Sequence, residues 1–189
     1  MRIVGGQLKG RPLVTPDGRA TRPTSDRARE SIFNILEHAP WAPGVAGRRV
    51  MDLFAGSGAL GFEALSRGAS FCLFVDNDSV ARGAIRDNIE ALSLFGQTRL
   101  HRRDATDLGG KPAGLAEPFD LVFLDPPYHA GLGARALTKL APGGWITPEA
   151  TVVLECAADE TPATDGFIIE DERVWGAAKV LFLAATKSA

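Results

Sequence analysis

The spacing of apolar residues along the chain changes near position 50. Beyond it, short runs that are apolar throughout alternate with segments whose apolar residues recur at helical spacing. Strands that are apolar throughout are typical of a parallel sheet with helices on both faces. The pattern therefore predicts an α/β, doubly wound fold. We expect strands at residues 50–54, 71–75, 99–102, 121–124, 151–154, 167–169 and 180–184.

Helices are expected between the early strands, at residues 59–67 and 79–94, and Gly68 closes the first of them. No clear helical pattern joins the last two apolar runs. A parallel neighbour needs a long crossover, whereas an antiparallel neighbour needs only a turn. We therefore expect an antiparallel strand at this edge of the sheet.

The first 40 residues have a different pattern. Residues 1–16 alternate apolar residues with glycine and basic residues, which predicts a small hairpin. Behind it, Thr24 or Ser25 is placed to cap a helix. The apolar residues of this helix recur as far as Ala39, and Pro40 ends the pattern.

Charge is unevenly distributed. Residues 1–49 carry nine basic and four acidic side chains, an excess of five positive charges, and the rest of the chain carries an excess of seven negative charges. On the predicted helix, Arg27 and Arg29 fall outside the apolar stripe, where they are free to face a partner. A basic segment on an acidic body indicates a local contact with phosphates, although a solvated arm fits the charge equally well.

The composition is that of one folded domain. The chain has 189 residues, of which 45% are hydrophobic and 23% are charged. We expect a single domain over residues 1–189, with a basic hairpin and helix at 1–40 and the catalytic core at 41–189. The sequence has no run of about 18 apolar residues and no signal peptide, so we expect a cytoplasmic protein. Cys72 and Cys156 lie in apolar runs and are expected to be buried thiols. The histidines lack metal-ligand spacing, so no metal is expected.

A glycine-rich segment follows the first predicted strand. Residues 52–61 read Asp-Leu-Phe-Ala-Gly-Ser-Gly-Ala-Leu-Gly and lead from the strand into a helix. Glycines let a backbone approach a ligand closely, and the start of a helix offers free amides. The spacing of Gly56, Gly58 and Gly61 also fits a dinucleotide-binding turn, and Asp76, about 20 residues further on, can hold ribose hydroxyls. These features suit both NAD and S-adenosylmethionine.

Two further aspartates favour S-adenosylmethionine. Asp52 stands just before the glycines, where a carboxylate can hold an ammonium group but would repel a pyrophosphate. Asp104, followed by Ala105, comes after the third predicted strand and is placed to contact an adenine. By itself Asp104 is more typical of a turn, so its assignment depends on the rest of the pattern.

The strand at 121–124 leads into Asp125-Pro126-Pro127-Tyr128, at the end of a strand where open α/β sheets bind ligands. Two prolines alone would only mark a strand end, which leaves the aspartate and the tyrosine unexplained. Guanine N2 and adenine N6 are poor nucleophiles because their lone pairs are delocalised into the ring. Hydrogen bonds to the Asp125 carboxylate and the Pro126 carbonyl favour a localised lone pair in the transition state. Tyr128 offers a ring on which an extruded base stacks. The motif predicts methyl transfer to an exocyclic amine.

With these motifs, the chain resembles the bacterial RsmD family, which are small-subunit ribosomal RNA guanine-N2 methyltransferases with a Rossmann-like fold. Many amino-methyltransferases share the motifs at 52–61 and 125–128, whereas the Arg-Pro-Thr pattern before the first helix is specific to the family. That pattern is Arg22-Pro23-Thr24, and the remaining matches are residues 2–6, residues 10–13, Arg27, Arg29, Glu30, Phe33 and Asn34.

The resemblance implies S-adenosylmethionine as the cofactor and the small ribosomal subunit or its RNA as the partner. It also implies a class I methyltransferase domain, for which we expect a monomer that needs neither membrane nor metal. The implied reacting residues are Asp125, Pro126, Pro127 and Tyr128. The implied cofactor contacts are Asp52, Phe54, Ala55, Gly56, Gly58, Asp76, Asn77, Asp104, Ala105 and Asp125. The implied RNA contacts are Arg2, Lys9, Arg11, Arg22, Arg27 and Arg29, with residues 22–29 able to serve instead as a lid over the cofactor.

Three other functions fit part of the pattern. The nearest is a DNA adenine-N6 methyltransferase, which uses the same reacting motif but normally carries a separate target-recognition domain. A small NAD-binding oxidoreductase would explain the glycines and leave residues 125–128 without a role. A non-catalytic RNA-binding module would explain the basic segment alone.

Overall fold

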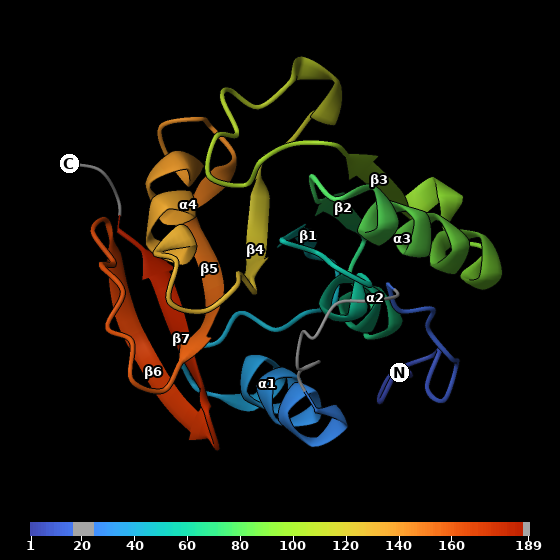
Figure 1. Ribbon diagram of the computed structural model, residues 1–189, viewed down its shortest axis with the longest axis horizontal. Helices are drawn as coiled ribbons and strands as arrows, with labels where there is room; N and C mark the ends of the chain where they lie inside the picture. The colour runs from blue at the N-terminus through green and yellow to red at the C-terminus, as the bar shows by residue number, and fades with distance from the viewer. Residues whose placement is uncertain (17–24, 187–189) are drawn as a thin grey trace.

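The computed structural model describes residues 1–16 and 25–186 (Figure 1). Its centre is a seven-stranded sheet in the order β3-β2-β1-β4-β5-β7-β6. Neighbours from β3 to β5 are parallel, and β7 lies antiparallel between β5 and β6. The predicted doubly wound sheet of Rossmann-like topology, with its antiparallel edge, is confirmed. The strands are β1 Arg49–Leu53, β2 Phe71–Val75, β3 Thr98–His101, β4 Phe119–Leu124, β5 Ile146–Ala157, β6 Phe167–Trp175 and β7 Ala178–Ala185.

In the part of the chain that the structure describes, four α-helices cover the sheet, and three of them were predicted. As expected, Ser25 caps the first, because its side chain accepts a hydrogen bond from the N–H of Ala28 at 3.1 Å. The fourth helix was missed because it is short and has glycines at its start, Gly131 and Gly133. The parallel pairing of β4 with β5 requires a crossover at this place, and that was the available signal. The helices are α1 Asp26–His38, α2 Ala59–Ser66, α3 Ser79–Leu92 and α4 Leu132–Leu140.

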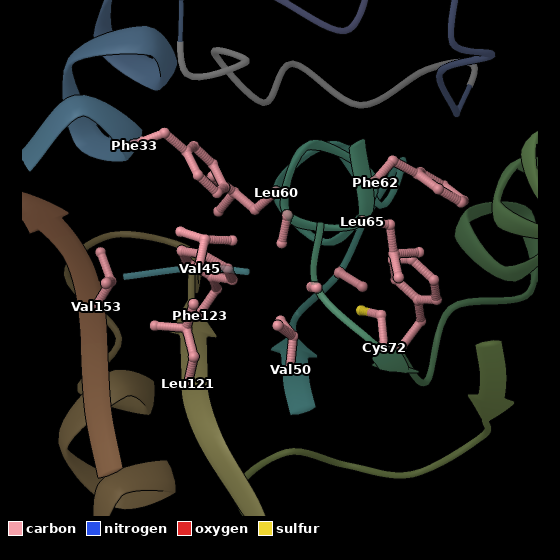
Figure 2. Packing of buried hydrophobic residues seen from close by; sticks show 14 of the residues in the cluster. Phe33, Val45, Val50, Leu60, Phe62, Leu65, Cys72, Leu121, Phe123 and Val153 are labelled. Atoms are coloured by element: carbon pink, nitrogen blue, oxygen red, sulfur yellow. The ribbon is translucent and has the colours of Figure 1, made fainter. Parts of the chain in front are cut away.

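The sheet has a hydrophobic core on each face, because successive residues of a strand point to opposite sides. On one face, Val50 and Phe123 belong to the core under α1, α2 and α3, where Phe33 and Phe62 also lie (Figure 2). On the other face, Met51 and its neighbours pack with α4 and the connections around it. Both cysteines are buried and unpaired, as predicted.

The N-terminal residues form the predicted small hairpin as a turn-rich loop, in which the N–H of Ile3 donates to the carbonyl of Arg11 at 3.0 Å and the N–H of Leu13 to the carbonyl of Met1 at 2.9 Å. An isolated antiparallel bridge between Arg2 and Pro12 closes the loop. Its backbone also bonds to α2: the N–H of Leu8 donates to Ser66 Oγ at 2.9 Å. A Cβ on Gly6, whose φ is +75°, would lie 2.1 Å from the Ser66 carbonyl oxygen. Glycine therefore allows this loop to lie directly on the helix.

The sheet brings two loops together at the carboxyl ends of its central strands β1 and β4. β1 has β2 on one side and β4 on the other, so the strand order reverses between β1 and β4. Leu53 and Leu124, the last residues of these strands, are paired in the sheet. Open α/β sheets bind ligands at such a reversal.

Candidate active site

The glycine segment turns sharply after β1. Phe54 has a φ of +57°, followed by Gly56 at +58° and by Gly58, the N-cap of α2, at +79°. Asp76 at the end of β2 holds this turn, because its Oδ2 accepts a hydrogen bond from the Gly56 N–H at 2.9 Å. Gly61 serves packing, since a Cβ there would lie 2.3 Å from the ring of Phe74. The turn is thus shaped in advance by the protein itself.

Asp52 lies buried beneath this turn, with 1% of its surface exposed. Its Oδ2 accepts a hydrogen bond from the N–H of Gly61 at 3.0 Å. Burial raises the pKa of Asp52 to about 8, a rise that the hydrogen bond opposes and the negative charge of Asp76 reinforces. A carboxylate in this situation attracts a cation.

The loops after β2 and β3 carry the other predicted cofactor contacts. Asn77 is exposed, Asp104 is exposed and Ala105 is buried. One oxygen of Asp104 accepts hydrogen bonds from the backbone N–H and the hydroxyl of Thr106, at 2.8 and 2.7 Å. These bonds hold the pKa of Asp104 below its usual value. Asp104 therefore shapes a turn, and it also remains at the surface where a ligand can reach it.

The loop after β4 holds the predicted reacting motif. The N–H of Asp125 points to the carbonyl of Leu53 across the sheet, at 3.5 Å. Burial raises the pKa of Asp125 well above its usual value, and the charges of Glu155 and Asp52 raise it further. Asp52, Asp125 and Glu155, which we call the carboxylate cluster, come from β1, from the end of β4 and from β5. Both aspartates are therefore poised to gain from a positive charge placed beside them.

Tyr128 is tied to β5. Its hydroxyl donates to Oε1 of Glu155 at 2.6 Å, and burial followed by this hydrogen bond raises the pKa of Tyr128. Beside the motif, a pocket of about 340 Å³ opens between the two prolines, the start of α4 and the end of β5. Glu155 and Glu160 line it.

Comparisons with known proteins agree with this geometry. A family model described as "Conserved hypothetical protein 95" matches residues 1–184. The chain is 37% identical, over 155 residues, to the ribosomal RNA small subunit methyltransferase D of Escherichia coli K12; the match covers 82% of this chain and 74% of the relative. It is 38% identical over 170 residues to "Putative rRNA methyltransferase YlbH" of Bacillus subtilis 168, covering 89% and 90% of the two chains.

The chain belongs to the RsmD family. A solved structure named "Putative methyltransferase yhhF from Escherichia coli" has the same fold, with a TM-score of 0.82 and 33% identity over 100% of this chain and 99% of that one. "Putative methylase HI0767 from Haemophilus influenzae" follows with a TM-score of 0.80 and 29% identity, covering 98% of each chain. The resemblance inferred from the sequence is thereby confirmed.

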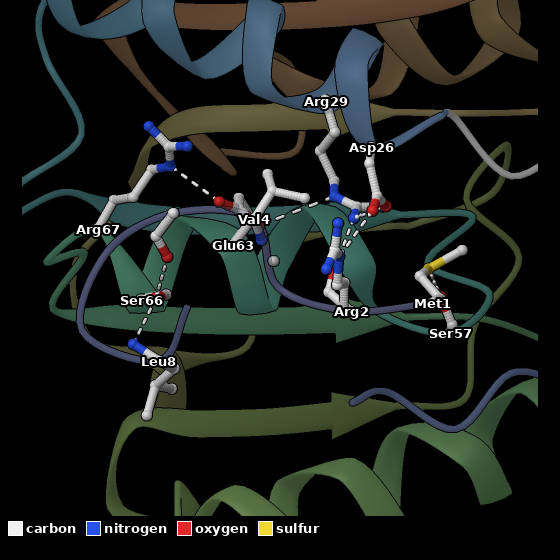
Figure 3. Close-up of polar contacts among 12 residues, drawn as sticks. Met1, Arg2, Val4, Leu8, Asp26, Arg29, Ser57, Glu63, Ser66 and Arg67 are labelled. Atoms are coloured by element: carbon white, nitrogen blue, oxygen red, sulfur yellow. Dashed lines mark hydrogen bonds and ion pairs between the residues drawn. The ribbon is translucent and has the colours of Figure 1, made fainter. Parts of the chain in front are cut away.

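The structure revises one of the RNA contacts expected of this RsmD-family chain. Arg29 is 1% exposed and lies between α1 and α2, where its guanidinium is 3.7 Å from a carboxylate oxygen of the fully buried Glu63 (Figure 3). Its other contacts are Asp26, at 2.9 Å, and the carbonyl of Arg2. The prediction that Arg29 faces a partner was wrong, because a position outside the apolar stripe can still face a buried carboxylate of another helix.

The other predicted RNA contacts differ in whether their side chains are hydrogen-bonded within the protein. Arg27 and Lys9 are exposed. Arg2 is also exposed but is hydrogen-bonded to Asp26 at 3.0 Å, and Arg11 donates to the carbonyl of Ala91 on α3 at 2.7 Å. Arg22, together with the Arg-Pro-Thr pattern, lies outside the described residues.

Sequence reasoning missed Glu155 and Glu160. Glu155 stands inside an apolar strand, and Glu160 lies in the connection that follows. The available signal was a carboxylate within the apolar residues 152–157, since such a group is buried only with partners.

The described residues contain neither a metal-binding cluster nor a membrane-spanning helix. Among residues 1–16 and 25–186, no cluster of His, Cys, Asp and Glu is arranged to hold a metal ion. Within the same ranges, no helix is long and apolar enough to cross a membrane.

Proposed function

We propose that this chain transfers a methyl group from S-adenosylmethionine to the exocyclic N2 of a guanine in small-subunit ribosomal RNA. The observation that carries the proposal is the arrangement at the switch between β1 and β4. There the glycine turn and Asp125-Pro126-Pro127-Tyr128 leave the sheet from paired strand ends. The E. coli relative is a ribosomal RNA small subunit methyltransferase, which supports ribosomal RNA of the small subunit as the substrate.

The residues of the glycine turn suit S-adenosylmethionine. A Cβ added to Gly56 would meet no atom closer than 4.0 Å, so space is open beside the turn. Asp52 would hold the ammonium group, because its buried carboxylate is stabilised by a cation. Asp76 and Asp104 would reach the ribose and the adenine, on the loops that follow β2 and β3. The cofactor supplies an electrophilic methyl group on a positively charged sulfur.

The reacting loop orients the amine. The two N–H groups of guanine N2 donate to the Asp125 carboxylate and to the Pro126 carbonyl, which directs the nitrogen lone pair out of the ring plane. With the cofactor bound, the nitrogen would form its bond to the methyl carbon as the S–C bond breaks, and it would then release one proton to Asp125 or to water. The raised pKa of Asp125 makes this carboxylate a better proton acceptor. Most of the acceleration comes from alignment of the two reacting atoms.

Substrate contact is proposed for the exposed basic side chains near the N-terminus. Lys9 and Arg27 are exposed and suit contacts with phosphates. The N-terminal loop also reaches the glycine turn, because Asn88 of α3 binds both the backbone of Val14 and the carbonyl of Ser57. The end of the N-terminal loop at Val14 therefore lies beside the glycine turn.

The decisive test uses labelled S-adenosylmethionine and three substrates: unmethylated small ribosomal subunits, naked ribosomal RNA and duplex DNA. Nucleoside analysis is expected to show N2-methylguanosine in the subunits. Asp125→Asn serves as the inactive control. N6-methyladenine in the DNA with unmodified RNA would contradict the proposed substrate while retaining the amine chemistry. Retention of NAD without any methyl transfer would contradict the proposal altogether.

A further inference from the structure

The reacting loop cannot hold itself in place. Pro126 and Pro127 have no backbone N–H, so neither can donate a hydrogen bond to the rest of the protein. His129 and Gly131 have left-handed backbone conformations, with φ of +59° and +66°, and the loop has no regular structure before α4 begins. Its position must therefore depend on contacts made by the residues around the prolines.

Two carboxylates on the β5 side supply such contacts. Glu155 accepts the hydrogen bond of the Tyr128 hydroxyl at 2.6 Å. Glu160 accepts a hydrogen bond from the N–H of His129 at 2.9 Å. The first contact fixes a side chain of the loop, and the second fixes its backbone one residue later.

Both carboxylates are anchored to the sheet. Glu155 is 6% exposed and is paired with Val180 of β7. The second oxygen of Glu160 accepts a hydrogen bond from the N–H of Ala157 at 2.7 Å, at the end of β5, and Lys179 binds the Glu160 carbonyl. The loop is thus connected to the interior of the sheet, because β5 has β4 on one side and β7 on the other.

Glu155 carries its charge next to the reacting loop. A buried carboxylate costs free energy unless cations or hydrogen bonds compensate for it. The charged groups that face Asp125 include Glu155 from β5 and Asp52 from β1, both of the same sign. An apolar residue on this strand would avoid the repulsion, but it could not hold the Tyr128 hydroxyl.

We propose that Glu155 and Glu160 are positioning residues of the methyl transfer, which hold Tyr128 and His129 so that the Pro126 carbonyl and the Asp125 carboxylate meet the target amine in the correct place. We call the pair the loop clamp. The inference rests on the proposed function, in that the amine is the group to be positioned. Neither carboxylate needs to touch the substrate or the cofactor.

The kinetic test compares Glu155→Leu, Glu155→Gln and Tyr128→Phe. Glu155→Leu removes the acceptor and is expected to lower kcat by roughly 10- to 100-fold, the effect of a misplacement of about 1 Å, with the Kd for S-adenosylmethionine changed less than about twofold. Glu155→Gln keeps an acceptor and is expected to restore most of kcat. Adding Tyr128→Phe to Glu155→Leu is expected to lower kcat little further, because both substitutions remove the same hydrogen bond. Glu170→Gln, on the exposed face of β6, is the matched control.

The pH dependence of kcat distinguishes a positioning role of Glu155 from a loss of folded protein in the variants. Glu155→Gln removes a negative charge beside Asp125 and so lowers the pKa of Asp125. The acidic limb of kcat is therefore expected to move to lower pH in this variant and to stay in place in Glu160→Gln. Glu160→Gln loses the acceptor for one of the two backbone N–H groups that Glu160 binds. This variant is therefore expected to lower kcat without moving the acidic limb.

A spectroscopic measurement tests the clamp without substrate. Tyr128 is the only tyrosine in the chain, so protein labelled with ¹³C at tyrosine Cζ gives one resonance to follow. It is expected to shift in Glu155→Leu and to stay in place in Glu170→Gln. An unchanged resonance, a fully active Glu155→Leu, or additive losses in the double variant would each overturn the clamp. A shifted resonance in a chain whose wild type methylates no substrate would instead contradict the proposed function.

Discussion

Two buried groups of charged side chains lie in this protein, and they are built in opposite ways. Between α1 and α2, Glu63 lies between Arg29 and Arg67, and Arg67 also binds Glu37 at 2.9 Å (Figure 3). We call these four residues the paired cluster. In the carboxylate cluster, by contrast, acids face acids, and the pKa values of Asp52 and Asp125 are raised.

The difference indicates what each group does. Opposite charges in the paired cluster compensate for one another, and Glu63 also accepts a hydrogen bond from the N–H of Val4 at 2.9 Å. That cluster attaches the N-terminal loop and α1 to α2. In the carboxylate cluster, charges of the same sign raise the pKa of Asp52 and of Asp125, so a cation bound beside these aspartates would be favoured. The first is therefore expected to govern stability and the second to govern function.

The largest expected effect is on activity. Asp125→Asn removes the charge that orients the amine and accepts its proton, so kcat is expected to fall by about 10²–10⁴-fold. Single-turnover assays with subunits would measure this, and equilibrium dialysis would measure cofactor affinity, which is expected to change only a few-fold. Equal losses in both would contradict the assignment of Asp125 to the reacting amine.

A comparable effect, this time on stability, is expected in the paired cluster. Glu63→Gln leaves Arg29 and Arg67 without their shared charge partner, which typically costs about 3–5 kcal/mol in the free energy of unfolding. Urea denaturation would measure it. Glu37→Gln, at the more exposed end of the same cluster, is the control and is expected to cost less than about 1 kcal/mol. Equal losses in the free energy of unfolding for the two variants would contradict the expectation that the buried Glu63 contributes more than Glu37.

Asp52→Asn is expected to have a smaller and opposite effect on stability. The pKa of Asp52 is raised to about 8 in the folded chain, so the folded state binds this proton more tightly than the unfolded state. Stability from Asp52 is therefore lost as pH rises from 3.8 to about 8. The neutral asparagine avoids this loss.

Thermal unfolding of Asp52→Asn would measure the difference. At pH 8 the Tm is expected to exceed that of the parent by roughly 2–4 °C, about 1 kcal/mol for a chain of this size, and the gain is expected to vanish near pH 4. Weaker binding of S-adenosylmethionine should accompany it. The exposed Asp107→Asn is the control. If Asp52→Asn were less stable than the parent, Asp52 would contribute to the stability of the fold, as the paired cluster is expected to do.

The smallest expected effect concerns RNA. Arg27→Glu reverses an exposed charge and is expected to weaken binding of small subunits by several-fold, with a shallower dependence on salt. Filter binding at several salt concentrations would measure both. Arg29→Lys is the informative comparison, because this buried residue is expected to affect unfolding rather than RNA binding. A loss of RNA affinity in Arg29→Lys alone would reverse the assignment.

The motifs of the proposed site can be recognised in the sequence, whereas the residues that surround them cannot. The glycines and Asp125-Pro126-Pro127-Tyr128 were identified because their effect is local: a turn, a missing N–H and a strand end are visible in consecutive residues. The positions of α4, Glu155 and Glu160 depend on partners far along the chain. Glu160, for example, contacts His129, which lies 31 residues before it.

The sequence by itself determined the parallel sheet, the antiparallel edge and the motifs at the ends of β1 and β4, because hydrophobic periodicity and backbone restrictions are properties of neighbouring residues. Only the tertiary structure decided which charges face water. Arg27 and Arg29 lie two positions apart on one helix, yet the first is exposed and the second is buried against Glu63 of another helix. The environment of a charged side chain is set by the elements that pack against it, and that packing is not written in the spacing of its own helix.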